Sequence, residues 1–242
     1  MLLWTSGCCQ LEVVLPVGIW GESCAGGCTR PLARARGGRY TPAVTESLHV
    51  DLAKARDALD LDRRLALVPT SAAVRGVFFN LAREALLREG LSHVVDAAPD
   101  LFGPRKAFSL HPVRELMMVY ATAGAVLDRD PVEGVARIAR RGSPFFAQSW
   151  LGDRFRRLFI TDPEAPLRWV ERSRDHLCNY GFWRLEHRGR HHVVLHMFNE
   201  YTWIDPWHRG GCEGLLRSCA VDGDVEVELD GPFEGRVHVR WD

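Results

Sequence analysis

Histidines are the residues of this chain whose type and spacing first suggest chemistry. His187, His191, His192 and His196 lie close together in the sequence, and imidazole is a common metal ligand. A strand period of two residues places His192 and His196 on one face and His191 on the other, with no acidic residue at ligand spacing. The run therefore indicates strand side chains rather than a metal site.

His208 and Cys212 form a second candidate pair. Their i, i+4 spacing puts both side chains on one face of a predicted helix, where both can ligate one metal ion. Two ligands do not complete a tetrahedral site, and the same holds for Cys24 and Cys28 near the start of the chain. We therefore assign no metal ligand, no cofactor and no catalytic residue.

Motifs for nucleophilic or phosphate chemistry are absent. The sequence contains no Gly-x-Ser-x-Gly elbow, Walker loop, dinucleotide fingerprint or His-Glu-x-x-His. The sequence thus favours a protein that is not an enzyme. A metal-dependent enzyme remains the alternative, using some of His191, His192, His196, His208 and Cys212.

Glycine crowds the helix that carries His208. Gly210, Gly211 and Gly214 all lie on it, although an interior glycine costs about 0.8–1 kcal/mol relative to alanine. We expect something to approach this helix closely. A sheet packed against it and the wall of a cavity are the two interpretations.

An arginine-rich stretch is a further candidate, for anion binding. It comprises Arg154, Arg156, Arg157, Arg168, Arg172 and Arg174. Because Asp153, Glu171 and Asp175 are interspersed, we expect a solvated face held by salt bridges rather than an anion site.

Helices must position these residues in the first half of the chain. Apolar side chains follow the helical period from Val74 to a stop at Gly90, and again from Pro112 to Leu127. Capping signals predict helices at Asp130–Arg141 and from Asp162 to about Tyr180. An aromatic stripe predicts one more helix between them, after Pro144.

After Gly181 the apolar period switches from 3.6 to 2. We predict a hairpin of residues 183–187 and 193–197, a helix from Asp205 to Cys219, and a second hairpin of residues 225–229 and 237–241. In the second hairpin, acidic side chains oppose basic ones (Glu226 and Glu228; Arg236, His238 and Arg240). The fold class is α+β, a helical amino-terminal half followed by a four-stranded antiparallel sheet in the order hairpin, helix, hairpin.

Composition sets the wider frame. The 242 residues are 46% hydrophobic and 26% charged, and 31 basic residues balance 31 acidic ones. No global field draws such a chain to nucleic acid or to a membrane, so neither is expected as a partner. A secretory signal needs basic residues before its apolar stretch and the first basic residue is Arg30, so a cytoplasmic location is expected. We expect residues 1–60 to form a poorly ordered Gly-, Cys- and Arg-containing extension with a short helix near Leu48–Leu61, and residues 62–242 to form a single domain.

Five short motifs in order resemble a known family. They are Val74-Arg75-Gly76-Val77-Phe78-Phe79-Asn80, Phe145-Phe146-Ala147, Asn179-Tyr180-Gly181, Gly211-Cys212-Glu213-Gly214 and Val237-His238-Val239-Arg240-Trp241. Together they resemble a paralogous family of unknown function abundant in myxobacteria. That family is distantly similar to the heme nitric-oxide/oxygen-binding (H-NOX), 4-vinyl-reductase and Golgi-tethering ligand-binding domains. The resemblance implies an H-NOX-like fold.

The same resemblance allows the heme-binding residues of H-NOX domains to be compared with this sequence one position at a time. The iron-binding histidine of H-NOX domains aligns with Pro166 or Leu167, neither of which can ligate iron. The Tyr-x-Ser-x-Arg signature for the heme propionates aligns with Phe198, Glu200 and Thr202. We therefore expect a binding or regulatory module without heme, acting through a small apolar ligand or a protein partner. A gas sensor that uses a displaced ligand, His176, is the remaining alternative.

Overall fold

The computed structural model describes residues 52–148 and 162–242, which all belong to Tyr40–Asp242, one of two compact units of the chain. Residues 1–51 and 149–161 lie outside the described ranges. Predictions that concern Cys24, Cys28 and the arginines at 154, 156 and 157 therefore lie outside them as well. None of the described helices has the length and apolar character needed to cross a membrane.

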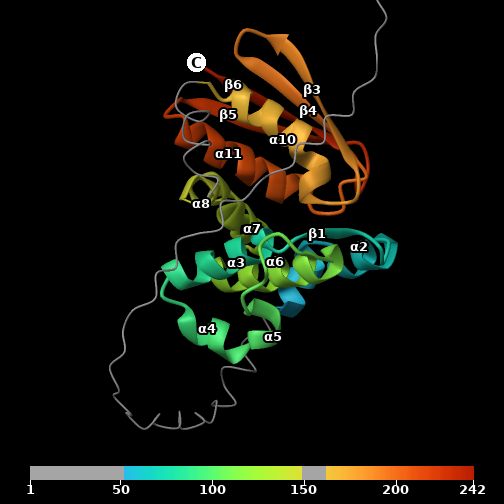
Figure 1. The fold of residues 1–242 in the computed structure, drawn as a ribbon, viewed down its shortest axis with the longest axis vertical. Helices are drawn as coiled ribbons and strands as arrows, with labels where there is room; N and C mark the ends of the chain where they lie inside the picture. The colour runs from blue at the N-terminus through green and yellow to red at the C-terminus, as the bar shows by residue number, and fades with distance from the viewer. Residues whose placement is uncertain (1–51, 149–161) are drawn as a thin grey trace, which may run out of the picture. The chain divides into compact units, whose positions relative to one another are not determined.

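Helices make up the first half of the described chain (Figure 1). Residues 52–58 are helical. They are followed by α2 (Leu61–Leu67), α3 (Val77–Arg88), α4 (Ser92–Ala97), α5 (Pro99–Phe102), α6 (Val113–Leu127), α7 (Pro131–Arg140) and α8 (Gly142–Gln148).

The predicted helix boundaries are confirmed where capping chemistry defines them. Gly90 has a φ of 76° just after α3, and the Asp130 side chain accepts a hydrogen bond from the Val132 amide at 3.0 Å at the start of α7. The prediction that a helix begins at Val74 was wrong. Val74 belongs to strand β1, and α3 begins three residues later.

A small two-stranded sheet accounts for that difference. Strand β1 (Ala73–Arg75) pairs antiparallel with β2 (Leu110–Pro112). The Asn179 side chain anchors β1, since its Oδ1 accepts from the Ala73 amide at 2.7 Å and its Nδ2 donates to the Ser71 carbonyl at 2.9 Å. These bonds draw residues 178–180 into an extended segment, so helix α10 (Glu164–Leu177) ends before the predicted Tyr180.

The second half forms the predicted α+β arrangement. Strands β3 (Phe182–Gly189) and β4 (His192–Phe198) are followed by a π turn η1 (Ile204–His208), α11 (Arg209–Ser218), β5 (Gly223–Leu229) and β6 (Gly235–Trp241). They form one antiparallel sheet in the order β3-β4-β6-β5. The predicted cross-strand register is confirmed, because Glu226 pairs with His238 and Glu228 with Arg236.

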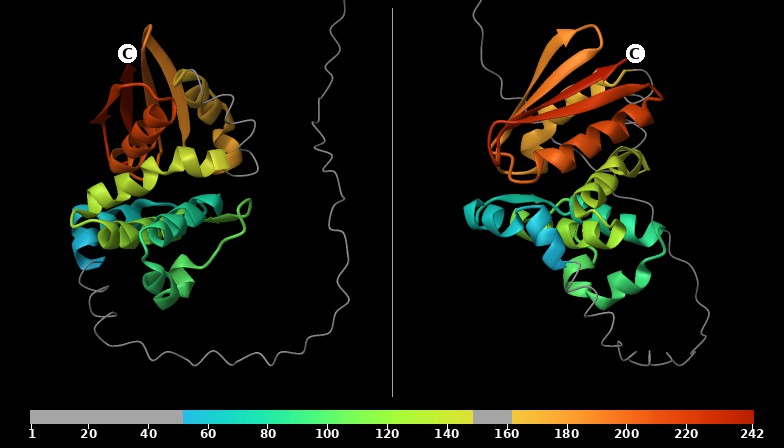
Figure 2. Two further views of the ribbon diagram at one scale, coloured as in Figure 1. Left: turned by 90° about the vertical axis from the view of Figure 1, so that its left-hand side faces the viewer. Right: turned by 180° about the vertical axis from the view of Figure 1, so that it is seen from behind.

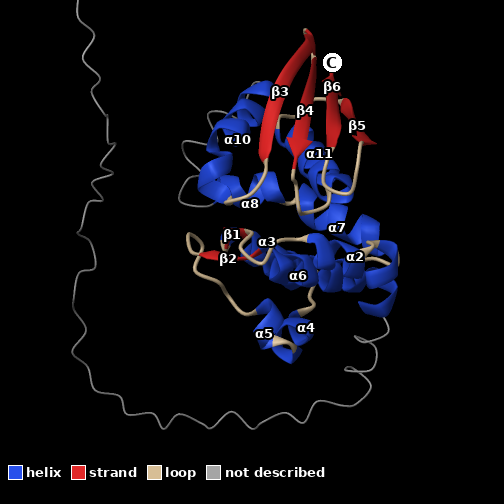
Figure 3. Cartoon of the chain, turned by 90° about the vertical axis from the view of Figure 1, so that its right-hand side faces the viewer, coloured by secondary structure: helices blue, strands red, loops and turns tan. Residues whose placement is uncertain are grey.

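Helices α10 and α11 lie against one face of this sheet, and α7 and α8 lie between α11 and the remaining helices (Figures 1, 2 and 3). The buried apolar side chains accordingly form two clusters. One is built mainly by α3 and α6, and the other by the sheet with α10 and α11. Ala55 and Leu59 belong to the first cluster, so residues that precede Asp62 contribute to the packed unit.

Glycine allows α7 to approach two helices at once. A Cβ on Gly134 would collide with the Gly124 carbonyl of α6, and a Cβ on Gly210 or Gly214 would collide with the α7 backbone at Ala136 or Arg140. The predicted close approach to these glycines is thus present. The sequence analysis named a sheet or a cavity as the neighbour, but the neighbour of Gly210 and Gly214 is helix α7.

Candidate functional site

A cavity of about 690 Å³ lies where the two buried clusters face each other. Its wall comes from β1, from helices α3, α6, α7, α8, α10 and α11, from η1, and from strands β3 and β4. Most of the lining is apolar, including Val77, Phe78, Leu81, Leu167, Leu195 and Leu215. Pockets of this size and character hold small organic ligands in many proteins.

Glu200 is the centre of a buried polar network in this wall. Its Oε2 accepts from Arg174 Nη2 at 2.8 Å and from Trp183 Nε1 at 2.9 Å. Its Oε1 accepts from the Thr202 amide at 3.1 Å and from the Thr202 hydroxyl at 2.6 Å, and His208 Nε2 lies 3.5 Å away. Both carboxylate oxygens are therefore fully used by protein donors.

Arg174 is the charge that balances Glu200. Its side chain is 4% exposed and that of Glu200 is 2% exposed, so both ends of the ion pair are buried. The guanidinium carbon lies 4.7 Å from the centre of the Tyr180 ring and 4.8 Å from that of Trp183, within cation–π range of both. Two of its nitrogens, Nε and Nη1, are buried with no hydrogen-bond partner among the described residues.

The network sets the protonation states. Burial acts to raise the pKa of Glu200, but the charges of Arg174 and His208 and the hydrogen bonds from His208 and Thr202 outweigh it and hold that pKa well below its ordinary value. Burial raises the pKa of Tyr180 well above its ordinary value, and the charge of Glu200 adds to the rise. Glu200 is thus an anion and Tyr180 a neutral phenol at neutral pH.

His208, Gly211 and Cys212 all line the cavity. Burial, with a contribution from Glu213, raises the pKa of the Cys212 thiol to about 12, so the sulfur is protonated and is a poor metal ligand. A Cβ on Gly211 would meet nothing within 4 Å. Of the three glycines on this helix, Gly211 alone fits the interpretation of a cavity wall.

The strand histidines lie elsewhere, and the structure does not join them to His208 and Cys212. His196 Nε2 lies 2.7 Å from Glu186 Oε2, which corrects the expectation that no acidic residue accompanies it. His192 lies 3.4 Å from His238, and His191 stacks on Trp241. The described residues contain no group of three or more His, Cys, Asp or Glu side chains able to hold a metal ion.

The positions that the resemblance aligned with the heme site do border the cavity. Pro166 and Leu167 lie in the wall, and so do Glu200 and Thr202. His176 also borders the cavity, but its side chain is exposed. It follows Pro166 by ten residues, or about 15 Å along the helix at 1.5 Å per residue.

Arg174 is the site residue that the sequence reasoning missed. We expected it on a solvated arginine face, and of that stretch Arg168 is indeed exposed and paired with Glu164. A signal was available, because Arg174 follows Leu167 by seven residues and therefore lies on the same apolar face of α10. Glu200 stands between aromatic residues in Phe198-Asn199-Glu200-Tyr201, an unusual setting for a carboxylate.

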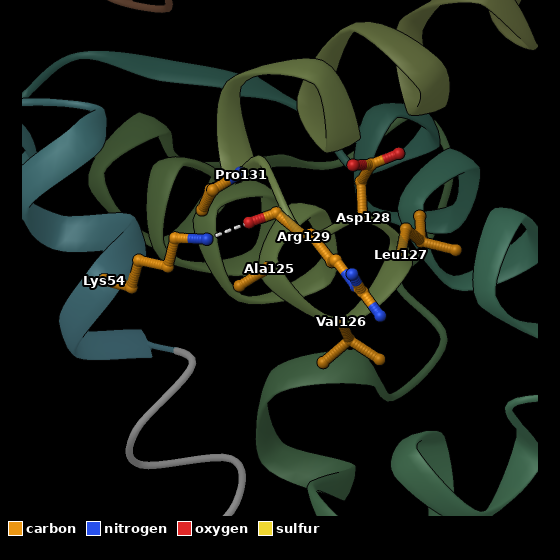
Figure 4. A pocket seen from close by; sticks show the side chains of 7 residues that line it. All are labelled: Lys54, Ala125, Val126, Leu127, Asp128, Arg129 and Pro131. Atoms are coloured by element: carbon orange, nitrogen blue, oxygen red, sulfur yellow. Dashed lines mark hydrogen bonds between the residues drawn. The ribbon is translucent and has the colours of Figure 1, made fainter.

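A second, smaller cavity of about 390 Å³ lies at the end of α6 (Figure 4). Lys54 points across it to donate a hydrogen bond to the Arg129 carbonyl. Its other lining residues are residues 125–127 at the end of α6, Asp128 and Pro131. This cavity contains no buried charged network, so the first cavity is the stronger candidate.

Comparison with solved structures identifies the fold. An Fe(II) unliganded H-NOX protein from K. algicida aligns with a TM-score of 0.53 and 12% identity, over 69% of this chain and 96% of that one. A structure titled for the modulation of heme redox potential through porphyrin distortion aligns with a TM-score of 0.54 and 12% identity, over 69% and 99% of the two chains. The predicted H-NOX-like fold is confirmed.

Sequence comparison adds one match. A family model described as "Protein of unknown function (DUF2378)" matches residues 67–242. None of the curated proteins matches the chain.

Proposed function

Because the chain belongs to the DUF2378 family of proteins of unknown function, we propose its function from its own cavity: it is a non-enzymatic binding module that takes up a small, largely apolar ligand. The family match confirms the predicted family of unknown function. That the family is abundant in myxobacteria stays a prediction. The observation that carries the proposal is the 690 Å³ cavity between the two apolar clusters. A protein that acted only through its surface would have no need of such a space in its interior.

The polar side chains of the wall support binding over catalysis. A general base needs a free lone pair directed at its substrate. Both carboxylate oxygens of Glu200 already accept hydrogen bonds, from Arg174, Trp183 and Thr202. The Cys212 thiol is protonated and so is a weak nucleophile.

A heme suits this wall poorly. An axial ligand must be a free imidazole, thiolate, thioether or phenolate. His208 Nε2 lies 3.3 Å from the Thr202 hydroxyl and beside Glu200, and Cys212 and Tyr180 are protonated. Pro166 and Leu167 supply no donor at the aligned position. We therefore derive no heme chemistry for this chain.

A small ligand is better supported than a protein partner. The exposed large apolar side chains of the described surface are Leu67, Phe108, Leu110, Phe182 and Leu229. Phe108 and Leu110 are close in sequence and Phe108 borders the cavity, whereas Leu67, Phe182 and Leu229 lie on separate elements. We place the protein in the cytoplasm, which agrees with the free thiols of Cys178, Cys212 and Cys219.

Ligand binding is tested first by a native mass spectrum of the full chain gently purified from its host, which should show an added small-molecule mass. The site is tested with Nile red, an uncharged dye that fluoresces in apolar surroundings. Gly211→Leu directs a side chain into the cavity and should weaken dye binding about tenfold, a loss within the range of overpacking penalties.

Gly211→Ala is the matched control, because it changes the same helix position and adds a single methyl group. It should bind the dye nearly as well as the wild type. Equal binding by the wild type and Gly211→Leu would show that the dye does not enter this cavity, and no binding at all would overturn the proposal.

A further inference from the structure

The buried network specifies one part of the ligand, an inference that rests on the proposed binding function. Arg174 borders the cavity and is 4% exposed, yet its Nε and Nη1 have no hydrogen-bond partner among residues 52–148 and 162–242. Leaving donors of a charged group unpaired in an apolar interior is unfavourable. Among the residues of the wall, Arg174 is therefore a charged group with donors left over for a molecule in the cavity.

The part of the chain that the structure describes offers these two nitrogens no acceptor. Glu200 already receives Arg174 Nη2, Trp183 Nε1, the Thr202 amide and the Thr202 hydroxyl. The Tyr180 and Trp183 rings contact the guanidinium through their faces, and the Tyr180 hydroxyl, which also interacts with Arg174 and Glu200, forms no hydrogen bond with Nε or Nη1. Either an ordered water or the ligand supplies the acceptor, and a ligand that fills the cavity takes the place of that water.

The charges of the wall indicate what kind of acceptor it is. Glu200 already pairs with Arg174 at 2.8 Å, and its other oxygen lies 3.5 Å from His208 Nε2. A carboxylate on the ligand would place a second negative charge beside Glu200 in an apolar cavity, which burial disfavours. An uncharged oxygen avoids that cost and still pairs with the guanidinium.

We propose that the ligand has an apolar body and one uncharged oxygen acceptor, of the carbonyl class, that accepts a hydrogen bond from Nε or Nη1 of Arg174. The apolar side chains of α3, α10 and α11 surround the body. Arg174 orients the ligand, and Glu200 with Tyr180 and Trp183 holds Arg174 in place.

Three probes with one ring system test this on the full chain, by displacement of Nile red. Ethylnaphthalene, acetonaphthone and naphthoate differ only in the head group, which is apolar, carbonyl or carboxylate. Acetonaphthone should bind about tenfold more tightly than ethylnaphthalene, as expected for a hydrogen bond to a charged group. Naphthoate should bind more weakly than acetonaphthone.

Arg174→Lys keeps the positive charge beside Glu200 and removes Nε and Nη1. It should reduce the preference for acetonaphthone over ethylnaphthalene to less than about threefold. Arg168→Lys on the exposed face of the same helix is the matched control and should keep the wild-type preference. The probe series on the wild type decides the matter even if Arg174→Lys fails to fold.

The outcomes separate the two proposals. Equal affinity for ethylnaphthalene and acetonaphthone would overturn the acceptor inference while leaving ligand binding in place. Tightest binding of naphthoate would overturn the uncharged head group. Failure of Nile red and of every probe to bind would overturn the proposed function, and the acceptor inference with it.

Discussion

At the scale of single residues, the Arg174–Glu200 pair is the most consequential feature of the described chain. Both side chains are almost fully buried, and the pair is held by aromatic rings and by two donors of Thr202. Burying two charges carries a large desolvation cost, so a buried pair is weak evidence for stability by itself. Removing one partner, by contrast, leaves an uncompensated charge and is strongly destabilising.

Glu200→Gln should lower the free energy of unfolding by about 3 kcal/mol at neutral pH, within the range for breaking a buried pair. Because the pKa of Glu200 is lowered in the folded protein, the carboxylate contributes its full stability above the unfolded value of about 4.3. That contribution is lost as the pH falls toward the lowered folded value. Urea denaturation at neutral and acidic pH should therefore show the gap between wild type and variant narrowing only below about pH 4.3.

Glu226→Gln is the control for this measurement. Glu226 pairs with Arg240 at 3.0 Å on the exposed face of the sheet, so its replacement should change the unfolding free energy by less than about 1 kcal/mol. A gap between the wild type and Glu200→Gln that stays constant down to the acid limit would contradict the lowered pKa.

At the scale of elements, the sequence predicted what repeats over several turns or several strand pairs. Helices α6 and α7 and both hairpins carry long periodic patterns with capping or turn residues at their ends. Strands β1 and β2 have three residues each, too few to show a period, and they form through pairing across 35 residues and the side chain of Asn179. Such contacts are not encoded locally.

The glycine contacts of α7 give a stability prediction. Gly214→Ala should lower the free energy of unfolding by about 1–3 kcal/mol despite the better helix propensity of alanine, because its Cβ meets the Arg140 backbone. Gly211→Ala on the same helix meets nothing within 4 Å and should be neutral or stabilising by up to about 1 kcal/mol. Thermal and urea unfolding of the two variants measure the difference, and equal effects would show that α7 and α11 are not in backbone contact.

At the scale of the whole molecule, the fold was predictable and the site only in part. The order of hairpin, helix and hairpin fixes an antiparallel sheet, and the capping residues fix the helices before it. The cavity was one of two interpretations of Gly210, Gly211 and Gly214, and only Gly211 borders it. The ion pair was missed because its partners are 26 residues apart on a helix and a loop, and no local pattern joins them.

Because the fold is H-NOX-like, heme binding by the whole chain can be tested directly. Adding hemin to the full chain should produce no one-to-one Soret band of a protein-ligated heme, because the donors that border the cavity are occupied, protonated or, for His176, exposed away from the aligned position. Absorption spectra with and without reductant measure this, with His176→Ala alongside. A saturable band that His176→Ala abolishes would establish a displaced heme ligand and contradict the expectation.

The division of the interior into two apolar clusters has a calorimetric consequence. The heat capacity increase on unfolding grows with the apolar surface that the folded state keeps from water. The cavity lies where the clusters face each other, and its wall draws on both, with Leu81 and Leu116 from one and Leu195 and Leu215 from the other. A molecule that fills the cavity covers apolar side chains of both clusters at once. Calorimetry should therefore find a larger heat capacity increase on unfolding for the ligand-bound protein than for the empty one.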